Sequence, residues 1–272
     1  MRWTIAAVSD LHAGSTLGLH PKAGTTLDDG QTYHPNKAQL WLWSKWLDYW
    51  KQVAAVRADK LAILLNGDLV DGNHHGTTQL VSGNPVDQAA ICSAILEPAF
   101  ALKPDHIIVT RGTEAHVGGS ACFEESIAKG WHGRGLPIVM HATNYTWWHF
   151  VGKFGNIVVD MAHHANMGGR NWTGPNACNL HAADLFYEHA KNKRPHPDLA
   201  LRAHAHRSGD SQDAHPVRYI AMPAWQIKTA FGHKIAAGKF ADIGGVIAQC
   251  GDTLEARRVL YPADPAPVWE AA

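Results

Sequence analysis

The sequence predicts an α/β fold in which parallel strands alternate with crossover helices. Up to Thr110, three short apolar runs alternate with two segments of helical periodicity. In the second half, shorter strand-like runs are separated by polar or glycine-containing turns. Hydrophobic residues make up 46% of the 272 residues, enough for a large core, and neither a repeat nor a linker divides the chain. We therefore expect one domain over 1–261 and a loose Pro/Ala-rich tail over 262–272.

The first half holds the strands and helices of the parallel sheet. Its strands are expected at Trp3–Ser9, Leu61–Leu65 and His106–Thr110. The first helix, over 36–56, begins with a capping box formed by Asn36 and Gln39. The second helix, over 84–102, has Pro85 in its first helical position, where a missing N–H costs nothing.

The first helix carries an apolar stripe at helical spacing. Its members are Leu40, Trp43, Leu47, Trp50 and Ala54. We expect this stripe to face the core rather than to stack on nucleobases.

The second half predicts shorter strands around one more helix. Three antiparallel strands are expected at Ile138–His141, Thr146–Val151 and Asn156–Ala162. A helix follows near Leu180–Lys191. The remaining strands are expected at Leu199–Ala203, Val217–Met222, Gly244–Gln249 and Ala256–Leu260.

Charge and cysteine content exclude several classes of protein. Lys and Arg number 24, as do Asp and Glu, so the chain lacks the positive excess with which a protein wraps a long nucleic acid. The four cysteines form no CxxC pair, which argues against a disulfide framework and a structural zinc site and favours a reducing cytoplasm. The N-terminal apolar run is too short and polar for a signal peptide, and no apolar stretch is long enough to span a membrane. We expect a cytoplasmic protein.

Polar clusters follow five predicted strands, at the places where α/β sheets carry their functional residues. These clusters are Asp10-Leu11-His12, Gly67-Asp68-Leu69-Val70-Asp71, Gly112-Thr113-Glu114-Ala115-His116, His163-His164 and His204-Ala205-His206. The chain has 19 histidines, and histidine is the commonest transition-metal ligand, so these clusters predict a metal site.

The residue types indicate which metals this site would bind. In DxH and HxH, two ligands one residue apart point the same way if the segment is extended. A mixture of carboxylates and imidazoles suits Mn, Fe, Zn, Co or Ni rather than Ca. One Asp can bridge two cations about 3.5–4 Å apart, and such a pair clamps a phosphate and generates hydroxide near neutral pH.

The motif order between Ser9 and His206 resembles the calcineurin-like metallophosphoesterase family. That resemblance implies a two-sheet αββα sandwich and a site with two divalent transition metals, of which Mn is favoured. In that site Asp10, His12 and His206 would hold one metal, Asp68 would bridge, and His204 with His163 would hold the second. His163 is preferred to His164 because it comes first as the apolar strand ends, and Asp71 would orient a ligand through a hydrogen bond.

The third motif departs from the family, in which most members have Gly-Asn-His. Here no Asn is present and the histidine comes two positions later. Three assignments remain open: Glu114 supplies a carboxylate ligand, Thr113 replaces Asn through its hydroxyl, or the second metal is lost. We expect Glu114, since a carboxylate binds metals more strongly than a neutral hydroxyl. His116 is expected to face the phosphate as the catalytic acid.

Further residues could contribute to substrate binding. Arg170 and Arg207 follow histidines of the metal motifs and could hold phosphate oxygens. His74-His75 lie in a Gly-rich loop that lines the pocket or faces solvent. The long segment 13–35 leaves the site directly after His12 and is either a substrate-facing lid or a disordered loop.

The resemblance implies a phosphoesterase in which metal-bridged hydroxide attacks phosphorus and His116 protonates the leaving group. A phosphodiester is favoured, such as a nucleotide or the end of a short single-stranded nucleic acid, by analogy with small family members. The alternative is a non-catalytic module that binds a phosphoester or a partner. A metal-dependent amide hydrolase fits poorly, because the first motif is DxH and eight βα units are lacking. The sequence identifies no protein partner.

Overall fold

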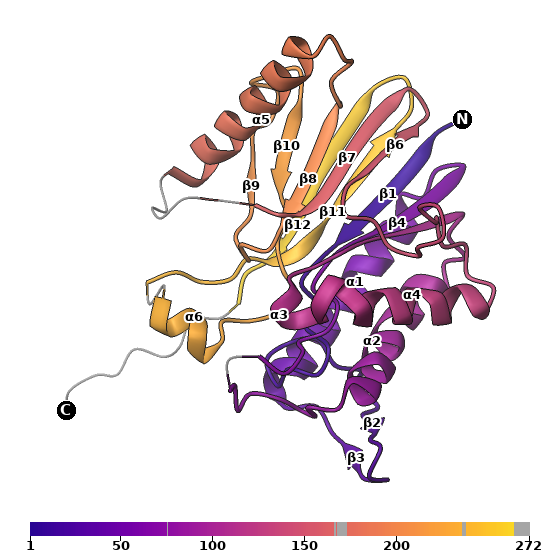
Figure 1. The fold of residues 1–272 in the computed structure, drawn as a ribbon, viewed down its shortest axis with the longest axis vertical. Coiled ribbons are helices and arrows are strands. Elements are labelled where there is room, and N and C mark those ends of the chain that lie inside the picture. Colours follow the sequence, from indigo (N-terminus) through magenta and orange to yellow (C-terminus); the bar gives the residue numbers. More distant parts are fainter. Residues whose placement is uncertain (75, 166, 168–172, 236–237, 264–272) are drawn as a thin grey trace.

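Two five-stranded sheets pack face to face, and helices cover both outer faces (Figure 1). This arrangement, seen in a computed structural model, is the expected αββα sandwich in one domain. The structure describes residues 1–74, 76–165, 167, 173–235 and 238–263. The expected tail lies almost entirely outside these residues.

The first sheet has the strand order β12-β11-β1-β4-β5. Its parallel strands are β1 (Trp3–Val8), β4 (Lys60–Asn66) and β5 (His106–Thr110). Two antiparallel strands complete it, β11 (Ile243–Cys250) beside β1 and β12 (Leu254–Tyr261) at the edge. The strands predicted in this sheet are all confirmed.

The second sheet has the order β6-β7-β8-β10-β9. Its strands are β6 (Phe150–Phe154), β7 (Ile157–His164), β8 (Leu199–Ala203), β10 (Arg218–Ala221) and β9 (Gly209–Asp210). The helix α5 (Gly174–Lys191) connects β7 to β8 and lies on the outer face of this sheet, so these two strands run parallel. The carboxyl ends of β7 and β8 therefore point to the same edge.

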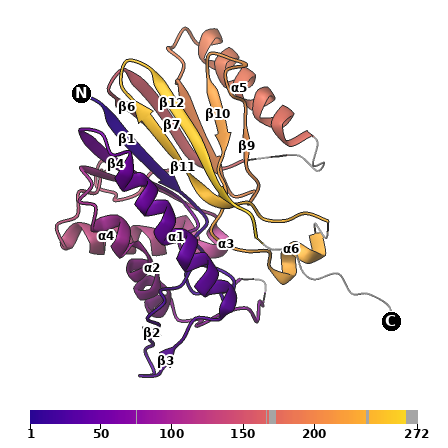
Figure 2. The ribbon, with the colours of Figure 1, turned by 180° about the vertical axis from the view of Figure 1, so that it is seen from behind.

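Three helices cover the first sheet, namely α1 (Lys37–Ala55), α2 (Pro85–Phe100) and α4 (Cys122–Gly133) (Figure 2). The shorter elements α3 (Glu114–Val117), η1 (Gly119–Ala121) and α6 (Ala230–Ile235) follow loops near the strand ends. The capping box of α1 and the N-terminal proline of α2 are confirmed.

The alternation of side chains along β1 explains why its apolar run is unbroken. Ile5 and Ala7 face the second sheet, whereas Ala6 and Val8 face the helices. All four are fully buried, because the strand has an apolar layer on each side. The first charged residue after this apolar run, Asp10, therefore comes only where the strand has ended.

The apolar stripe predicted for α1 is wrong in its phase. Leu40 is 39% exposed and Leu47 is 43% exposed. The buried face instead carries Leu42, Trp46, Tyr49, Trp50 and Val53, of which only Trp50 was predicted. Aromatic and aliphatic residues occur on several faces of this helix, so more than one stripe has helical spacing. Packing decides which stripe is buried. The Trp46 ring contacts the Trp225 ring, and the Trp46 indole N–H donates to the Ile95 carbonyl.

The strand predicted at Ile138–His141 does not form, and the one predicted at Thr146–Val151 begins only at Phe150. Ile138 and Trp147 instead make isolated bridges to β5. A turn separates these bridges, with Ala142 at φ 54°. These two short pieces provide hydrogen-bond partners for the outer edge of β5 but do not form a continuous strand.

The segment 13–35 packs against the domain and carries a small hairpin of β2 (Thr25–Thr26) and β3 (Thr32–Tyr33). Figure 1 shows the hairpin beyond the helical layer, away from α6. Leu19 is fully buried in the core of that layer. No helix in the described part of the chain is long and apolar enough to cross a membrane.

Candidate metal centre

The ends of strands from both sheets meet at one place and bring the predicted ligands together. Asp10 follows β1, Asp68 follows β4, His163 lies at the end of β7, and His204 with His206 follows β8. Within the described residues they form two groups whose ligand atoms lie within 4.8 Å of one another: Asp10, His12 and His206, and Asp68, His163 and His204.

Most of these residues adopt a backbone conformation that is unusual for a side chain. Asp10, His12, Asp68, His204 and His206 have φ between 45° and 70°. Non-glycine residues pay about 1–2 kcal/mol for this left-handed region, and such residues concentrate at functional sites. The premise that DxH and HxH lie in extended segments is therefore wrong, since sharp turns after the strands aim these side chains at one point.

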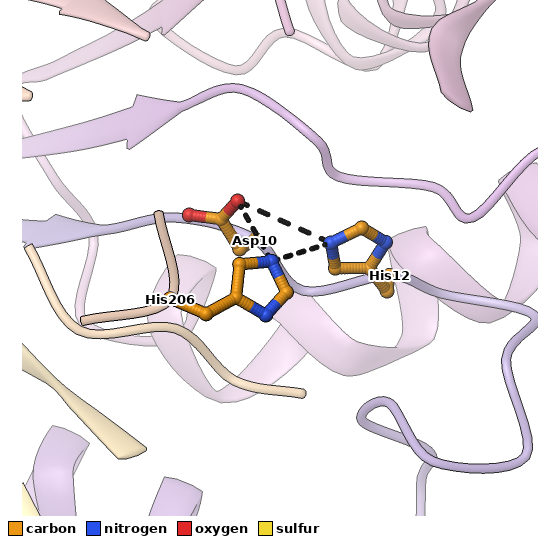
Figure 3. Close-up of side chains that lie close together, drawn as sticks. All are labelled: Asp10, His12 and His206. Carbon is orange, nitrogen blue, oxygen red and sulfur yellow. Dashed lines mark hydrogen bonds and ion pairs between the residues drawn. The ribbon is translucent and has the colours of Figure 1, made fainter. Parts of the chain in front are cut away.

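The first group converges on a common centre, as Figure 3 shows. Asp10 Oδ1 lies 3.3 Å from His206 Nε2 and 4.0 Å from His12 Nε2, and the two Nε2 atoms are 3.1 Å apart. Neighbouring ligand atoms bound about 2.1 Å from one cation stand roughly 3.0–3.4 Å apart, so this spacing fits a shared ion. Asp10 Oδ2 accepts a hydrogen bond from the His204 backbone N–H, which turns Oδ1 toward the histidines.

Asp71 fixes which nitrogen of His12 faces this centre. His12 Nδ1 lies 2.9 Å from Asp71 Oδ1 and donates its proton to that carboxylate. Nε2 is then left with a lone pair directed toward Asp10 and His206. This is the orienting role that the sequence predicts for Asp71, and Gln226 Nε2 supports it by donating to the same carboxylate oxygen over 3.2 Å.

The second group is built in the same way. Asp68 Oδ1 accepts from the Thr113 backbone N–H over 2.6 Å, and Oδ2 lies 3.1 Å from His163 Nε2. The Asn66 carbonyl accepts from His163 Nδ1 over 2.7 Å, so Nε2 is again the nitrogen on the inner side. Asp68 also lies within 4.8 Å of the His12 ligand atom, which places it between the two groups. The neighbouring His164 is exposed and lines a separate groove beside α5.

Two buried atoms show that the set of donors fits a cation. Asp10 Oδ1 and His163 Nε2 have no hydrogen-bond partner of acceptable geometry among the described residues. Their close neighbours in the cluster lie at ion-pair distance but not in the direction of a hydrogen bond. Buried polar atoms are otherwise almost always bonded. Both atoms face the inside of the cluster, where a bound cation would satisfy them.

The electrostatics of the cluster favour positive charge. Burial opposes ionisation of Asp10 and Asp68, but the neighbouring histidines outweigh it and hold the pKa of Asp10 at about 2 and that of Asp68 well below its usual range. Burial likewise opposes protonation of His163, yet Asp68 outweighs it and raises the His163 pKa to about 10. The field that retains a proton on this imidazole would equally attract a metal ion.

The third motif brings Thr113 to the cluster and turns Glu114 away. Thr113 Oγ1 lies 3.0 Å from His204 Nδ1, and its backbone N–H bonds Asp68. Glu114 is exposed, and its carboxylate accepts from the Ser120 backbone N–H over 3.1 Å. The expectation that Glu114 is a ligand is therefore corrected. The physical reason is that α3 begins at Glu114, so this side chain projects from the outer side of the first turn.

His116 faces the same cavity from α3. Its Nδ1 donates to the Asp71 carbonyl over 2.7 Å, and its ring lies 4.6 Å from that of His12 and 4.2 Å from that of His74. Burial, and next the charge on His12, lowers the pKa of His116 to about 4. With Nδ1 held by this carbonyl, Nε2 is the remaining ring nitrogen.

Close backbone contacts hold the ligand loops in register. A Cβ on Gly67 would lie 2.5 Å from His163 Nδ1, and one on Gly112 would lie 2.3 Å from the Asp68 backbone nitrogen. Glu124, fully buried in α4, accepts from Leu69 N–H and Gly112 N–H and so ties the second motif to the third. Sequence reasoning missed Glu124, whose position in an ordinary amphipathic helix gives no signal.

The cluster opens into a cavity of about 650 Å³. Arg207 and His74 line it. Of the described residues in the segment 13–35, Ser15 lines it as well. That segment therefore contributes one side chain to the lining of the cavity. Arg170 and His75 lie outside the described residues.

Comparisons with known proteins give similarity to solved structures alone. No family profile matches this sequence, and no curated protein matches it. A dimetal phosphatase from Danio rerio is 8% identical with a TM-score of 0.43, covering 96% of this chain and 99% of that one. A purple acid phosphatase from yellow lupin (Lupinus luteus) seeds is 11% identical with a TM-score of 0.45, covering 96% and 53%. Zinc-complexed Vps29 from Entamoeba histolytica is 10% identical with a TM-score of 0.40, covering 94% and 98%.

Proposed function

We propose that this protein is a dinuclear metal-dependent phosphoesterase, as the order of its motifs implies. The observation that carries the proposal is the pair of ligand groups joined by Asp68 at the floor of one cavity. Two divalent cations held there would neutralise phosphate charge and supply a hydroxide nucleophile. Asp10, His12 and His206 would hold one ion and His163 with His204 the other, with Asp68 between them.

The nitrogen and oxygen ligands suit Mn, Fe, Zn, Co or Ni, and we retain Mn as the favoured ion. In place of Glu114 we propose the Thr113 hydroxyl as the third-motif contact to the second ion, because it lies beside His204. A hydroxyl is a weaker ligand than a carboxylate, so the second ion should be held less firmly than the first.

The chain's own residues would position the substrate and move a proton. Arg207 lines the cavity and would hold a phosphate oxygen. His116 would donate a proton from Nε2 to the leaving oxygen. The pKa of His116 is low in the protein alone, and a bound phosphate anion beside it would raise it toward the range an acid needs.

We favour a phosphodiester over a monoester as the substrate because of the extent of the cavity. Besides the proposed ligands, the cavity is lined by residues 76–79 and by described residues of 226–234 and 239–241. It therefore offers room for groups beyond the phosphate. We also propose a cytoplasmic location, since all four cysteines are free thiols.

The test is an activity panel on metal-stripped protein reconstituted with Mn, Fe, Zn, Co or Ni. The substrates are bis(p-nitrophenyl) phosphate, p-nitrophenyl phosphate, cyclic nucleotides and short single-stranded DNA. Asp68→Asn should lower turnover by about 100-fold or more, as loss of a central electrostatic group does. Asp105→Asn, a surface carboxylate paired with Lys60, is the matched control and should keep full activity. Metal uptake without hydrolysis of any substrate would favour the binding module instead.

A further inference from the structure

One wall of the cavity is basic and aromatic. It is formed by residues from 226–234 and 239–241, which place three lysines and two phenylalanines on the cavity: Lys228, Lys234, Lys239, Phe231 and Phe240. The sequence has no Asp or Glu between 223 and 241, although acidic and basic residues balance over the whole chain. The positive charge is therefore concentrated at this wall.

The wall is tied to the ligand-bearing loops. The Trp225 backbone N–H donates to the Asp10 carbonyl over 3.0 Å, and Gln226 donates to the Asp71 carboxylate over 3.2 Å. The Gln79 side chain, which also lines the cavity, accepts from the Ala230 backbone N–H over 2.8 Å. These bonds set the distance between the wall and the metal ligands.

The two phenylalanines present exposed ring surface. Phe231 is 53% exposed and Phe240 is 72% exposed, and Lys228 Nζ lies 5.9 Å from the centroid of the Phe240 ring. Aromatic rings interleaved with cations are what single-stranded nucleic acids and nucleotides bind, with bases stacked on the rings and phosphates beside the cations.

The acidic groups lie elsewhere in the cavity. Among its described lining residues, Asp68 and Asp71 are the acidic ones, and both lie at the floor with the histidines. Thr77, Thr78 and Gln79 line the cavity next to Ala230 and can hydrogen-bond a sugar or a base. The cavity thus separates an anionic floor for cations from a cationic wall for anions.

We propose that this wall binds the base and an additional phosphate of a nucleotide phosphodiester whose scissile phosphate lies at the floor. The inference rests on the proposed function and names its substrate class, a nucleotide with at least one phosphate beyond the scissile one. Hydrolysis adds water across one P–O ester bond: the hydroxide oxygen joins phosphorus, and the leaving oxygen takes a proton. The products are a phosphomonoester and an alcohol.

Binding tests the wall independently of turnover. The ligands are thymidine 3′,5′-bisphosphate and the base-free fructose 1,6-bisphosphate, measured by calorimetry on the Mn-loaded protein. Lys234→Ala/Lys239→Ala should weaken both about tenfold, and Phe231→Ala/Phe240→Ala should weaken the nucleotide about tenfold with a smaller effect on the sugar bisphosphate. Lys153→Ala, an exposed lysine of β6, is the control and should change neither. Equal binding by wild type and both double variants would overturn the proposal.

Kinetics separate this inference from the proposed function. For a 5′-phosphorylated thymidine dinucleotide relative to bis(p-nitrophenyl) phosphate, the ratio of kcat/KM values should fall about tenfold in the lysine double variant. An unchanged ratio in an active enzyme overturns the inference alone. Absence of hydrolysis of either substrate by wild type overturns the proposed function, and the calorimetry then decides whether the wall is a nucleotide site.

Discussion

Hydrogen bonds behind His12 and His163 decide which atom of each ring faces the candidate metal centre. Asp71 holds Nδ1 of His12, and the Asn66 carbonyl holds Nδ1 of His163, so both present Nε2. The motif spacing predicted these ligands because each follows a strand end. It could not predict the hydrogen bonds, which join residues 59 and 97 positions apart in the chain.

Thr113 and Glu114 provide a direct test of the corrected third motif. Thr113→Ala should weaken binding of the second ion and be partly rescued by excess Mn, because its hydroxyl lies at His204. Glu114→Ala should leave metal content unchanged, since its carboxylate bonds Ser120. Metal titration of both variants measures the difference, and Thr113→Ser is the control that keeps the hydroxyl. A metal deficit in Glu114→Ala would restore the original assignment.

The proposed acid, His116, should be separable from the metal ligands. His116→Ala should lower turnover by roughly 10²–10⁴ on an alkyl leaving group and much less on nitrophenolate, which scarcely needs a proton. Its metal content, measured by elemental analysis, should stay at the wild-type value. Loss of metal in this variant would instead make His116 a ligand, as its distance to His12 and Asp68 would allow.

The residue-level errors have a common cause. Thr113 and Glu114 are adjacent, and which of them faces the site depends on where α3 begins, which local sequence does not determine. The left-handed backbone of Asp10 and His206 is likewise imposed by contacts between distant loops, such as the bond from Trp225 N–H to the Asp10 carbonyl. The residue types therefore predicted which motifs lie in the cluster, whereas tertiary contacts determined the orientation of their side chains.

At the scale of elements, the predictions succeeded where both faces of a strand are buried. The β1, β4 and β5 runs are unbroken because a helical layer and a second sheet cover them. At the edge of β5 the prediction failed, since Ile138 and Trp147 pair with that strand as isolated bridges. An edge needs only part of its hydrogen bonds covered, so the sequence pattern there is weaker.

The phase of α1 can be measured with a matched pair of leucines. Leu42→Ala should cost about 2–5 kcal/mol of unfolding free energy, because this fully buried side chain would leave a cavity. Leu47→Ala should stay within about 0.5 kcal/mol of wild type, as surface changes do. Urea denaturation of both variants gives the comparison. Equal costs at the two positions would contradict the buried face described here.

On the scale of the whole molecule, the candidate metal centre joins the two sheets. Asp10 and Asp68 come from the first sheet, and His163, His204 and His206 come from the second. Carboxylates from one sheet and imidazoles from the other are thereby brought close together at a largely buried site. The cluster is consequently a property of the assembled sandwich rather than of any one strand.

Metal binding should therefore release protons and weaken as the pH falls. Despite burial, nearby carboxylates raise the pKa of His12 and bring that of His163 to about 10. At pH 7 the metal-free protein therefore retains a proton on the His163 ring. A metal needs the lone pair of His163 Nε2, so loading displaces this proton, and a lower pH strengthens its competition. Calorimetry in buffers of different ionisation enthalpy should show release of about one proton from His163 at pH 7. Affinity independent of pH between 6 and 8 would contradict this electrostatic account.

The number and position of bound ions test the central claim most directly. Crystals of the Mn-reconstituted protein should give two anomalous scattering peaks about 3.5–4 Å apart, with an Asp68 oxygen between them. His12 and His206 should contact one peak, and His163 and His204 the other. A single peak after full reconstitution, or two peaks that do not share Asp68, would contradict the dinuclear centre.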